Sequence, residues 1–230
     1  MRIDRLLSNL PRFNRQHSRL LLAAGRVRID GQICRDSRFE VRTFHCVELD
    51  DEVLQTGKPA RYFMLHKPIG VVSATTHPEH RTVLDLLDEP DKHELHLAGR
   101  LDLNTSGLLI ITNDGLWSRR ATAPDGSHAK VYRVETEQDI APACIEAFAQ
   151  GLYFAYEDLV TRPALLEIEA PRRARLTLHE GRYHQIKRMF GHFQNKVVGL
   201  HRESSGAIQL DPSLPPGTYR SLTQAEIASV

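Results

Sequence analysis

A polar loop that holds an arginine and an aspartate stands just ahead of an apolar run. Residues 99–107 read GRLDLNTSG, with Asp102 two positions after Arg100. Residues 108–112 (LLIIT) are apolar and β-branched enough for a buried strand. A carboxylate in a loop held against a core strand, beside an arginine, is a candidate catalytic acid or nucleophile. The local pattern also fits an aspartate that only stabilises its own turn, which is the commoner role of a loop aspartate.

A second group of candidate residues lies further along the chain. In residues 180–190 (EGRYHQIKRMF), apolar side chains at helical spacing predict a helix packed on the core. His184, Lys187 and Arg188 stand three and four positions apart, so they should share another face of that helix. Tyr132 stands in the segment KVYRV, whose alternation predicts a strand in which an aromatic side chain is usually half-buried.

The elements that must position these residues predict an α+β body. Strand patterns follow one another in series, which favours a mainly antiparallel mixed sheet flanked by helices over parallel β-α-β units. Strands are expected over 61–67, 108–112, 130–134, 152–159, 164–169, 175–179 and 197–202. Helices are expected over 82–87, 116–121 (capped by Asp114) and 142–150.

Composition limits the classes of protein that this chain can be. Its 230 residues are 41% hydrophobic and 26% charged, as in a soluble globular protein, and no stretch approaches the roughly 20 apolar residues of a membrane span. Three scattered cysteines and the lack of a secretory signal favour a reducing, cytoplasmic environment. The sequence lacks glycine-rich nucleotide motifs and metal-ligand spacing, so we expect no cofactor and no metal.

The first 50 residues are the basic part of the chain. They hold ten arginines and six acidic residues, a net charge of +4, whereas the rest holds 20 basic and 23 acidic residues. Such a basic module points to nucleic acid. A helix from Ile3 to Leu10 should end before Pro11, and a second helix should follow the cap Asn14 and run to Ala24. An Asp-Gly pair at residues 30–31 predicts a hairpin after it.

This order of helix, helix and hairpin, with the segment AGRVRIDGQ at the junction, resembles the S4 RNA-binding domain over about residues 1–48. The resemblance implies that arginines on one helix face and the adjoining strand contact RNA phosphates, which gives affinity more than sequence readout. Those expected to do so are Arg15, Arg19, Arg26 and Arg28. Residues 49–60, which are polar and contain glycine and proline, predict a linker to a second domain over 61–230.

The loop of Asp102 has the form of a known catalytic signature. The stretch GRLDLNTSGLLIITNDG resembles the motif G-R-L-D-x-x-T-x-G-L-[LI]-x-x-T-[ND]-D-G of the RsuA-type pseudouridine synthases. The segments RYFMLHKPIG, KVYRV, EGRYHQIKRMF and GTYRSLTQAEI resemble the family's other motifs in the same order. The resemblance covers about residues 61–230 and implies a cofactor-free enzyme that isomerises uridine to pseudouridine in RNA.

The resemblance also implies a role for each matching residue. Asp102 would be the nucleophile, whether it attacks C1′ or C6 of uridine or assists elimination to a glycal. Tyr132 would stack on the base and move a proton. Lys187 would pair with Asp102 and favour its ionised form, with Arg182 as the competing partner. Arg100 would fill the gap left by the flipped base. The other residues expected to bind substrate are Arg182, His184, Gln185, Arg188 and Leu200.

The expected partner is ribosomal RNA. RYFMLHKP, EGRYHQIKRMF and the ending LTQAEIASV are similar to the family member that modifies 16S rRNA, which implies uridine 516 as the target. Lys67 would meet RNA phosphate or remain solvated. The enzyme is expected to act as a monomer, within an assembling small ribosomal subunit. The alternatives are a 23S rRNA or tRNA synthase of the same kind and a non-catalytic RNA-binding factor of ribosome assembly.

Overall fold

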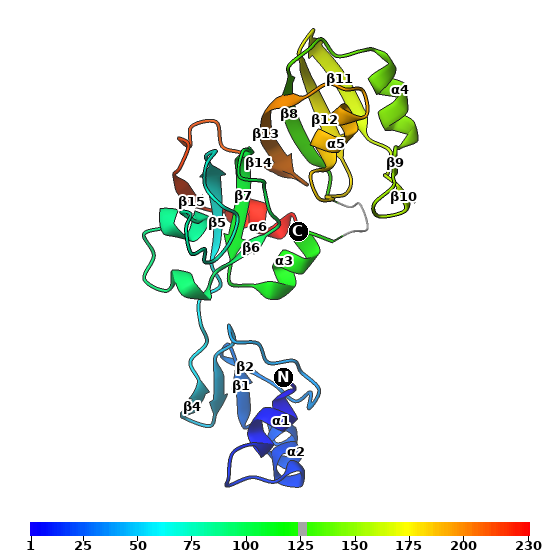
Figure 1. Ribbon diagram of the computed structural model, residues 1–230. Helices are drawn as coiled ribbons and strands as arrows, with labels where there is room; N and C mark the ends of the chain where they lie inside the picture. The colour runs from blue at the N-terminus through cyan, green and yellow to red at the C-terminus, as the bar shows by residue number, and fades with distance from the viewer. Residues whose placement is uncertain (124–127) are drawn as a thin grey trace. The chain divides into compact units, whose positions relative to one another are not determined.

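The structure is a computed structural model that describes residues 1–123 and 128–230. The chain forms two compact units, Met1–Ala60 and Arg61–Val230 (Figure 1). Within the described residues, no helix has the length and apolar character needed to cross a membrane.

The first unit combines two helices with a small antiparallel sheet of order β2-β1-β3-β4. Its elements are α1 (Ile3–Ser8), α2 (Arg15–Ala23), β1 (Val27–Ile29), β2 (Gln32–Ile33), β3 (Val47–Leu49) and β4 (Glu52–Gln55). As predicted, the Asn14 side chain caps α2 by accepting a hydrogen bond from the backbone N–H of His17 at 2.8 Å. Helix α1 ends two residues before the predicted Leu10, because a residue that precedes a proline disfavours helical backbone.

The segment predicted as a linker is partly folded. Strand β4 pairs with β3, and the register of Leu49 with Glu52 makes residues 50–51 a tight hairpin turn. Asp50 adopts the left-handed conformation that such turns require, with φ +54°. The polar composition of 49–60 predicted a linker, but an edge strand of a small sheet buries little and needs few apolar residues.

The second unit is built on a nine-stranded mixed sheet. Seven strands run in the order β11-β12-β8-β13-β7-β5-β15, while β14 pairs with β13 and β6 pairs with β7. Of the described pairings in this sheet, only that between β7 and β13 is parallel. The predicted α+β fold with a mainly antiparallel mixed sheet is therefore confirmed.

The elements of the second unit are β5 (Tyr62–Lys67), two 3-10 helices η1 (Val83–Leu86) and η2 (Lys92–Glu94), β6 (His96–Ala98), β7 (Ser106–Thr112), α3 (Gly115–Ala121), β8 (Lys130–Thr136), α4 (Ala143–Gln150), β9 (Tyr153–Phe154), β10 (Leu159–Val160), β11 (Leu165–Ala170), β12 (Arg173–Leu178), α5 (Gln185–Gly191), β13 (Val197–Ser205), β14 (Ile208–Gln209), β15 (Tyr219–Ser221) and α6 (Gln224–Ala228). The single strand predicted over 152–159 is wrong. The chain instead turns between β9 and β10, which form a separate hairpin in which the Tyr153 hydroxyl donates to the Asp158 carboxylate at 2.7 Å.

Strand β7 is buried on both faces, as its apolar run predicts. Leu108 and Ile110 pack with residues of α3 and α6. Leu109 and Ile111 pack on the opposite face with residues of η1. A strand held on both faces fixes the loop that enters it, and that loop carries Asp102.

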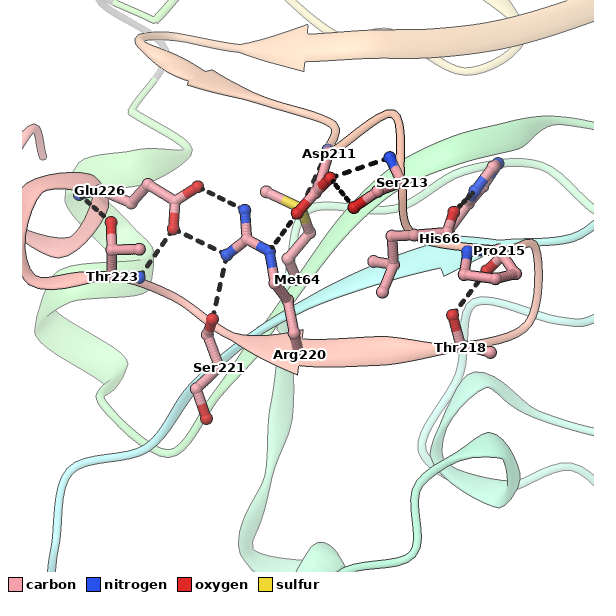
Figure 2. A network of polar contacts seen from close by, with 11 residues as sticks. Met64, His66, Asp211, Ser213, Pro215, Thr218, Arg220, Ser221, Thr223 and Glu226 are labelled. Carbon is pink, nitrogen blue, oxygen red and sulfur yellow. Dashed lines mark hydrogen bonds and ion pairs between the residues drawn. The ribbon is translucent and has the colours of Figure 1, made fainter.

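The closing segment of the chain is tied to the sheet by one arginine (Figure 2). Arg220 on β15 donates to the carboxylate of Asp211 at 2.9 Å and, through both terminal nitrogens, to that of Glu226 at 2.9 Å. Glu226 also completes a capping box with Thr223 at the start of α6. The hydrogen bonds from Ser213, together with that from Arg220, lower the pKa of Asp211 to about 2. Arg220 thus joins the loop before β15 to the helix after it.

Candidate active site

A pocket of about 580 Å³ opens where the Asp102 loop meets β8, β13 and the start of α5. The loop connects β6 to β7. Sequence-predicted residues that line this pocket are Arg100, Asp102, Tyr132, Arg182, His184, Gln185, Lys187 and Leu200. The fold therefore gathers residues that lie up to about 100 positions apart in the chain.

The backbone of the Asp102 loop is held by a buried lysine. Lys67, the last residue of β5, is 0% exposed. Its ammonium group donates to the carbonyl oxygens of Pro68 (2.9 Å), Asp102 (3.1 Å), Leu103 (3.4 Å) and Thr105 (2.8 Å). The expectation that Lys67 meets RNA phosphate or solvent is wrong, because its charge is used inside the protein. Burial lowers the pKa of Lys67 to about 8, against the raising effect of the Asp102 charge.

A signal for this role was present in the sequence. Residues 63, 65 and 67 share one face of a strand, because side chains alternate. Phe63 and Leu65 are buried on that face, so the lysine that follows them enters the interior as well. A buried ammonium group needs hydrogen-bond acceptors, and the loop carbonyls supply them.

A serine fixes the residue just before Asp102. The Ser73 hydroxyl donates to the carbonyl of Leu101 at 2.7 Å and accepts from the N–H of the same residue at 3.1 Å. The Leu101 side chain is buried in the core formed by α4, α5 and β8. The N–H of Thr105 donates to the Asp102 carbonyl at 3.0 Å and closes the turn. The Asp102 side chain therefore starts from a fixed backbone, which limits the positions that its carboxylate can take.

The carboxylate of Asp102 pairs with Lys187. The ammonium nitrogen of Lys187 lies 2.9 Å from Oδ2 of Asp102, and the two side chains are about one-third exposed. Nε2 of His184 lies 3.5 Å from the same oxygen. Arg182, the competing partner, instead donates to Glu180 at 2.9 Å. Within the described residues no group bonds Oδ1 of Asp102, so this oxygen is available to a substrate.

The segment before α5 is ordered by a second buried polar group. Gln185 donates to Glu180 at 2.8 Å and accepts from the backbone N–H of Arg182 at 3.0 Å. The carboxylate of Glu180 also accepts from the N–H of Arg162 at 2.9 Å. Gln185 lines the pocket, but both ends of its amide serve this network. His184 adopts a left-handed backbone conformation with φ +49°, a conformation that is common where a side chain is aimed at a functional site.

Arg188 does not reach the pocket in the described structure. Its two terminal nitrogens each lie 2.6 Å from a carboxylate oxygen of Glu157, and its guanidinium lies 3.7 Å from the ring centre of Phe154. Both partners belong to the β9–β10 hairpin region. Helical spacing alone placed Arg188 with His184 and Lys187, but this bidentate pair draws the side chain the other way.

Tyr132 and Leu200 form part of the opposite wall. Tyr132 on β8 stands opposite Arg202 on β13, is 8% exposed, and lines the pocket. Leu200 packs partly against the core. Lys130, Tyr183 and Arg202 are among the lining residues that the sequence analysis missed. Among the described residues, no group of three or more histidine, cysteine, aspartate or glutamate side chains could hold a metal ion.

The basic residues of the first unit lie on its surface. Arg15, Arg19, Arg26 and Arg28 are all exposed. Arg26 pairs with Asp50 at 2.6 Å, which occupies much of its guanidinium. Arg15 instead borders a second pocket, of about 530 Å³, whose other lining residues include Arg2 and Arg5.

Comparisons with known proteins identify the family of this chain. Residues 61–192 match the family model for RNA pseudouridylate synthase, and residues 1–45 match that for the S4 domain. The chain is 60% identical over 230 residues to the ribosomal small subunit pseudouridine synthase A of Pseudomonas aeruginosa, with 100% of both chains covered. It is 45% identical to the protein of the same name from Escherichia coli, again with 100% of both covered.

A solved structure described as a pseudouridylate synthase has a TM-score of 0.72 at 37% identity and covers 100% of this chain and 99% of that one. These matches confirm the family that the motifs predicted. The chain therefore belongs to the RNA pseudouridylate synthase family, enzymes that isomerise uridine to pseudouridine in RNA, and carries an S4 domain at its N-terminal end.

Proposed function

We propose that this enzyme converts uridine 516 of 16S rRNA into pseudouridine, with Asp102 as the nucleophile. The observation that carries the chemistry is the Asp102 loop, which Lys67 and Ser73 hold while Lys187 pairs with the carboxylate in a nucleotide-sized pocket. The choice of RNA rests on the relatives, which match this chain from end to end and carry the name of a small-subunit enzyme.

The proposed reaction exchanges one glycosidic bond for another. The bond from N1 of uracil to C1′ breaks, the base rotates, and a bond from C5 to C1′ forms. C5 then loses its hydrogen to solvent, and N1 gains a proton. The target base must first leave its stack, which costs a few kcal/mol. Arg100, exposed at the pocket rim, is placed to occupy the space that the base leaves.

Tyr132 is assigned the stacking face and a proton-transfer role. Its hydroxyl has no hydrogen-bond partner within the described residues, so it is available to the substrate. Tyr132→Phe keeps the ring, so RNA affinity should change less than about twofold, while the single-turnover rate should fall about 10²-fold or more. RNA titration measures the affinity, and single-turnover experiments at saturating RNA measure the rate. Tyr132→Leu, which also removes the aromatic face, should weaken binding as well. An unchanged rate in Tyr132→Phe would exclude the hydroxyl from proton transfer.

The lowered pKa of Lys67 predicts a pH dependence in which rate and stability move in opposite directions. Above pH 8 the neutral amine has two N–H donors instead of three, so the loop is held less firmly and the rate should fall about tenfold by pH 9.5. The unfolded chain keeps this proton up to the ordinary lysine pKa of 10.5. Between pH 8 and 10.5 it therefore binds more protons than the folded protein, so this group makes the free energy of unfolding rise with pH.

Single-turnover rates and urea unfolding at pH 7, 8 and 9.5 test both signs on the same samples. If the Lys67 ammonium group holds the loop, the rate should fall over this range without a matching loss in the free energy of unfolding. A flat rate profile across this range would show that the protonation state of Lys67 does not control the loop.

In this proposal, the first unit binds RNA at positions away from the target uridine. The exposed Arg15 and Arg19 project from α2, and Arg2 and Arg5 border the same surface pocket as Arg15. Contacts of this kind bind phosphate and position the RNA without reading its sequence. The partner in this proposal is the rRNA of an assembling small ribosomal subunit in the cytoplasm, with the enzyme acting as a monomer.

Tritium release tests the proposal, because forming the C5 bond expels the hydrogen at C5. The purified enzyme is incubated with 16S rRNA, 23S rRNA or tRNA transcribed with [5-³H]uridine. One equivalent of tritium per 16S molecule is expected. Release from 23S rRNA or tRNA alone would keep the reaction and overturn the choice of RNA. Binding without release from any of the three, before and after addition of ribosomal proteins, would favour a non-catalytic RNA-binding factor.

A further inference from the structure

A buried arginine in the wall of the active-site pocket has no carboxylate partner among the described residues. Arg202 on β13 is only 3% exposed, yet it lines the pocket. Its Nε donates to the carbonyl oxygen of Leu108 at 2.7 Å. Its terminal nitrogens make no hydrogen bond within the described structure, and they are not among the enclosed polar atoms that lack a partner. The terminal nitrogens therefore keep some exposure to solvent, and the pocket is the cavity that this residue lines.

A second cation lies close to the first. Lys130, at the start of β8, also lines the pocket, and the only hydrogen bond that its ammonium group makes within the described residues goes to the carbonyl oxygen of His128 at 3.3 Å. Burial lowers the pKa of Lys130, and the charge of Arg202 lowers it further. Two cations thus lie near each other in a partly desolvated wall of the pocket. This arrangement is unfavourable until an anion binds between them.

The other cations that line the pocket are either paired with a carboxylate or exposed to solvent. Lys187 is neutralised by Asp102, and Arg182 by Glu180. Arg100 lies in solvent at the rim, where an isolated charge costs little. Within the described structure, Lys130 and Arg202 are the buried or half-buried lining cations that lack a carboxylate.

We propose that Arg202 and Lys130 form a phosphate subsite that binds an RNA phosphodiester next to the target nucleotide. This inference rests on the proposed function, because it takes RNA as the substrate. An uncharged uracil ring cannot neutralise two cations, whereas a phosphodiester is the anion that a flipped nucleotide necessarily brings with it. A guanidinium whose Nε edge is already held presents its terminal nitrogens, which match the oxygens of a phosphate.

The sheet holds this subsite at a fixed distance from the base-binding wall. Arg202 stands directly opposite Tyr132 on β8 and Gly107 on β7. At Gly107, with φ +109°, the two strands approach so closely that a Cβ atom would lie 2.3 Å from the carbonyl oxygen of Arg202. Only glycine permits this approach. Arg202, which we propose binds the phosphate, and Tyr132, which we propose stacks on the base, are therefore held together in one rigid part of the sheet.

The salt dependence of RNA binding tests the subsite. A 16S rRNA transcript that contains the target uridine is titrated with wild type, Lys130→Gln, Arg202→Gln and Arg202→Lys over a range of KCl concentrations. Each glutamine variant should raise Kd about 5- to 50-fold, and the slope of log Kd against log [KCl] should become shallower by about 0.7 to 0.9. Arg202→Lys keeps the charge and should retain most of the slope. The matched control is Arg133→Gln, which removes an exposed cation that lies outside the pocket on the same strand as Lys130; its slope should equal that of wild type.

The outcomes separate this inference from the function on which it rests. If wild type releases tritium and binds RNA but the glutamine variants keep the wild-type slope, the subsite does not exist. An unchanged slope with a slower rate at saturating RNA would assign the two cations to uracil instead of phosphate. Arg202→Gln also loses the bond to Leu108, so if it unfolds, Lys130→Gln alone decides. A wild-type protein that neither binds nor converts any RNA would overturn the proposed function itself.

Discussion

Asp102→Asn should fold and bind RNA but form no pseudouridine. The carboxamide has the shape of the carboxylate, and its oxygen can still accept the hydrogen bond from Lys187. Because the pair is about one-third exposed, the free energy of unfolding should change by less than about 1 kcal/mol. The amide cannot act as a nucleophile, so the single-turnover rate should fall by at least about 10⁴-fold. Tritium release and urea unfolding on the same preparation measure the two effects.

Asp139→Asn is the matched control. Asp139 is an exposed carboxylate that also pairs with a basic residue, Arg172, at 3.1 Å, but it lies outside the pocket. This variant loses the same charge and should keep the wild-type rate. Measurable turnover by purified Asp102→Asn, after hydrolysis of the asparagine to aspartate has been excluded by mass spectrometry, would remove Asp102 from the mechanism.

Lys67→Met should lower both stability and activity. Methionine fits the space of the buried lysine stem but gives no donor to the four carbonyls that the ammonium group now serves. Leaving buried carbonyls without partners costs about 1 to 3 kcal/mol each, and part of that is recovered by water or by movement of the loop. We therefore expect a loss of about 2 to 4 kcal/mol in the free energy of unfolding. The remaining folded protein should be at least about 10²-fold slower, because the backbone of Asp102 is displaced.

Urea unfolding and single-turnover rates of folded protein measure the two losses. Lys196→Met, which removes an exposed lysine of the same unit, should change neither. A Lys67→Met protein with wild-type stability and rate would contradict the assignment of Lys67 as the residue that holds the loop. A stable but slow Lys67→Met protein would support the role of Lys67 in positioning the loop, and it would show that these hydrogen bonds contribute less to the free energy of unfolding than we expect.

The sequence predicted the parts of the site that depend on local pattern. The apolar run at residues 108–112 had to be buried, and Asn14 and Asp114 had to begin helices, because each signal depends on a few neighbouring residues. The order of the motifs then named Asp102, Tyr132 and Lys187, which the fold brings to one pocket.

What the sequence could not predict depends on contacts between distant segments. Arg188 is drawn to Glu157, 31 positions away, and helical spacing contains no trace of that pair. The role that we propose for Arg202 depends on which strands lie beside β13, and nothing local to residue 202 gives the sheet order. Strand β4 was missed for another reason, since an exposed edge strand has the composition of a linker.

The most direct measurement is a map of pseudouridines across both rRNAs from cells that lack this gene, by carbodiimide-blocked primer extension. The account predicts that one signal in 16S rRNA, at uridine 516, disappears. Wild-type enzyme should restore it, and the Asp102→Asn protein, expressed at the same level, should not. An intact 16S map in the deletion strain, or restoration of the signal by Asp102→Asn, would contradict the account.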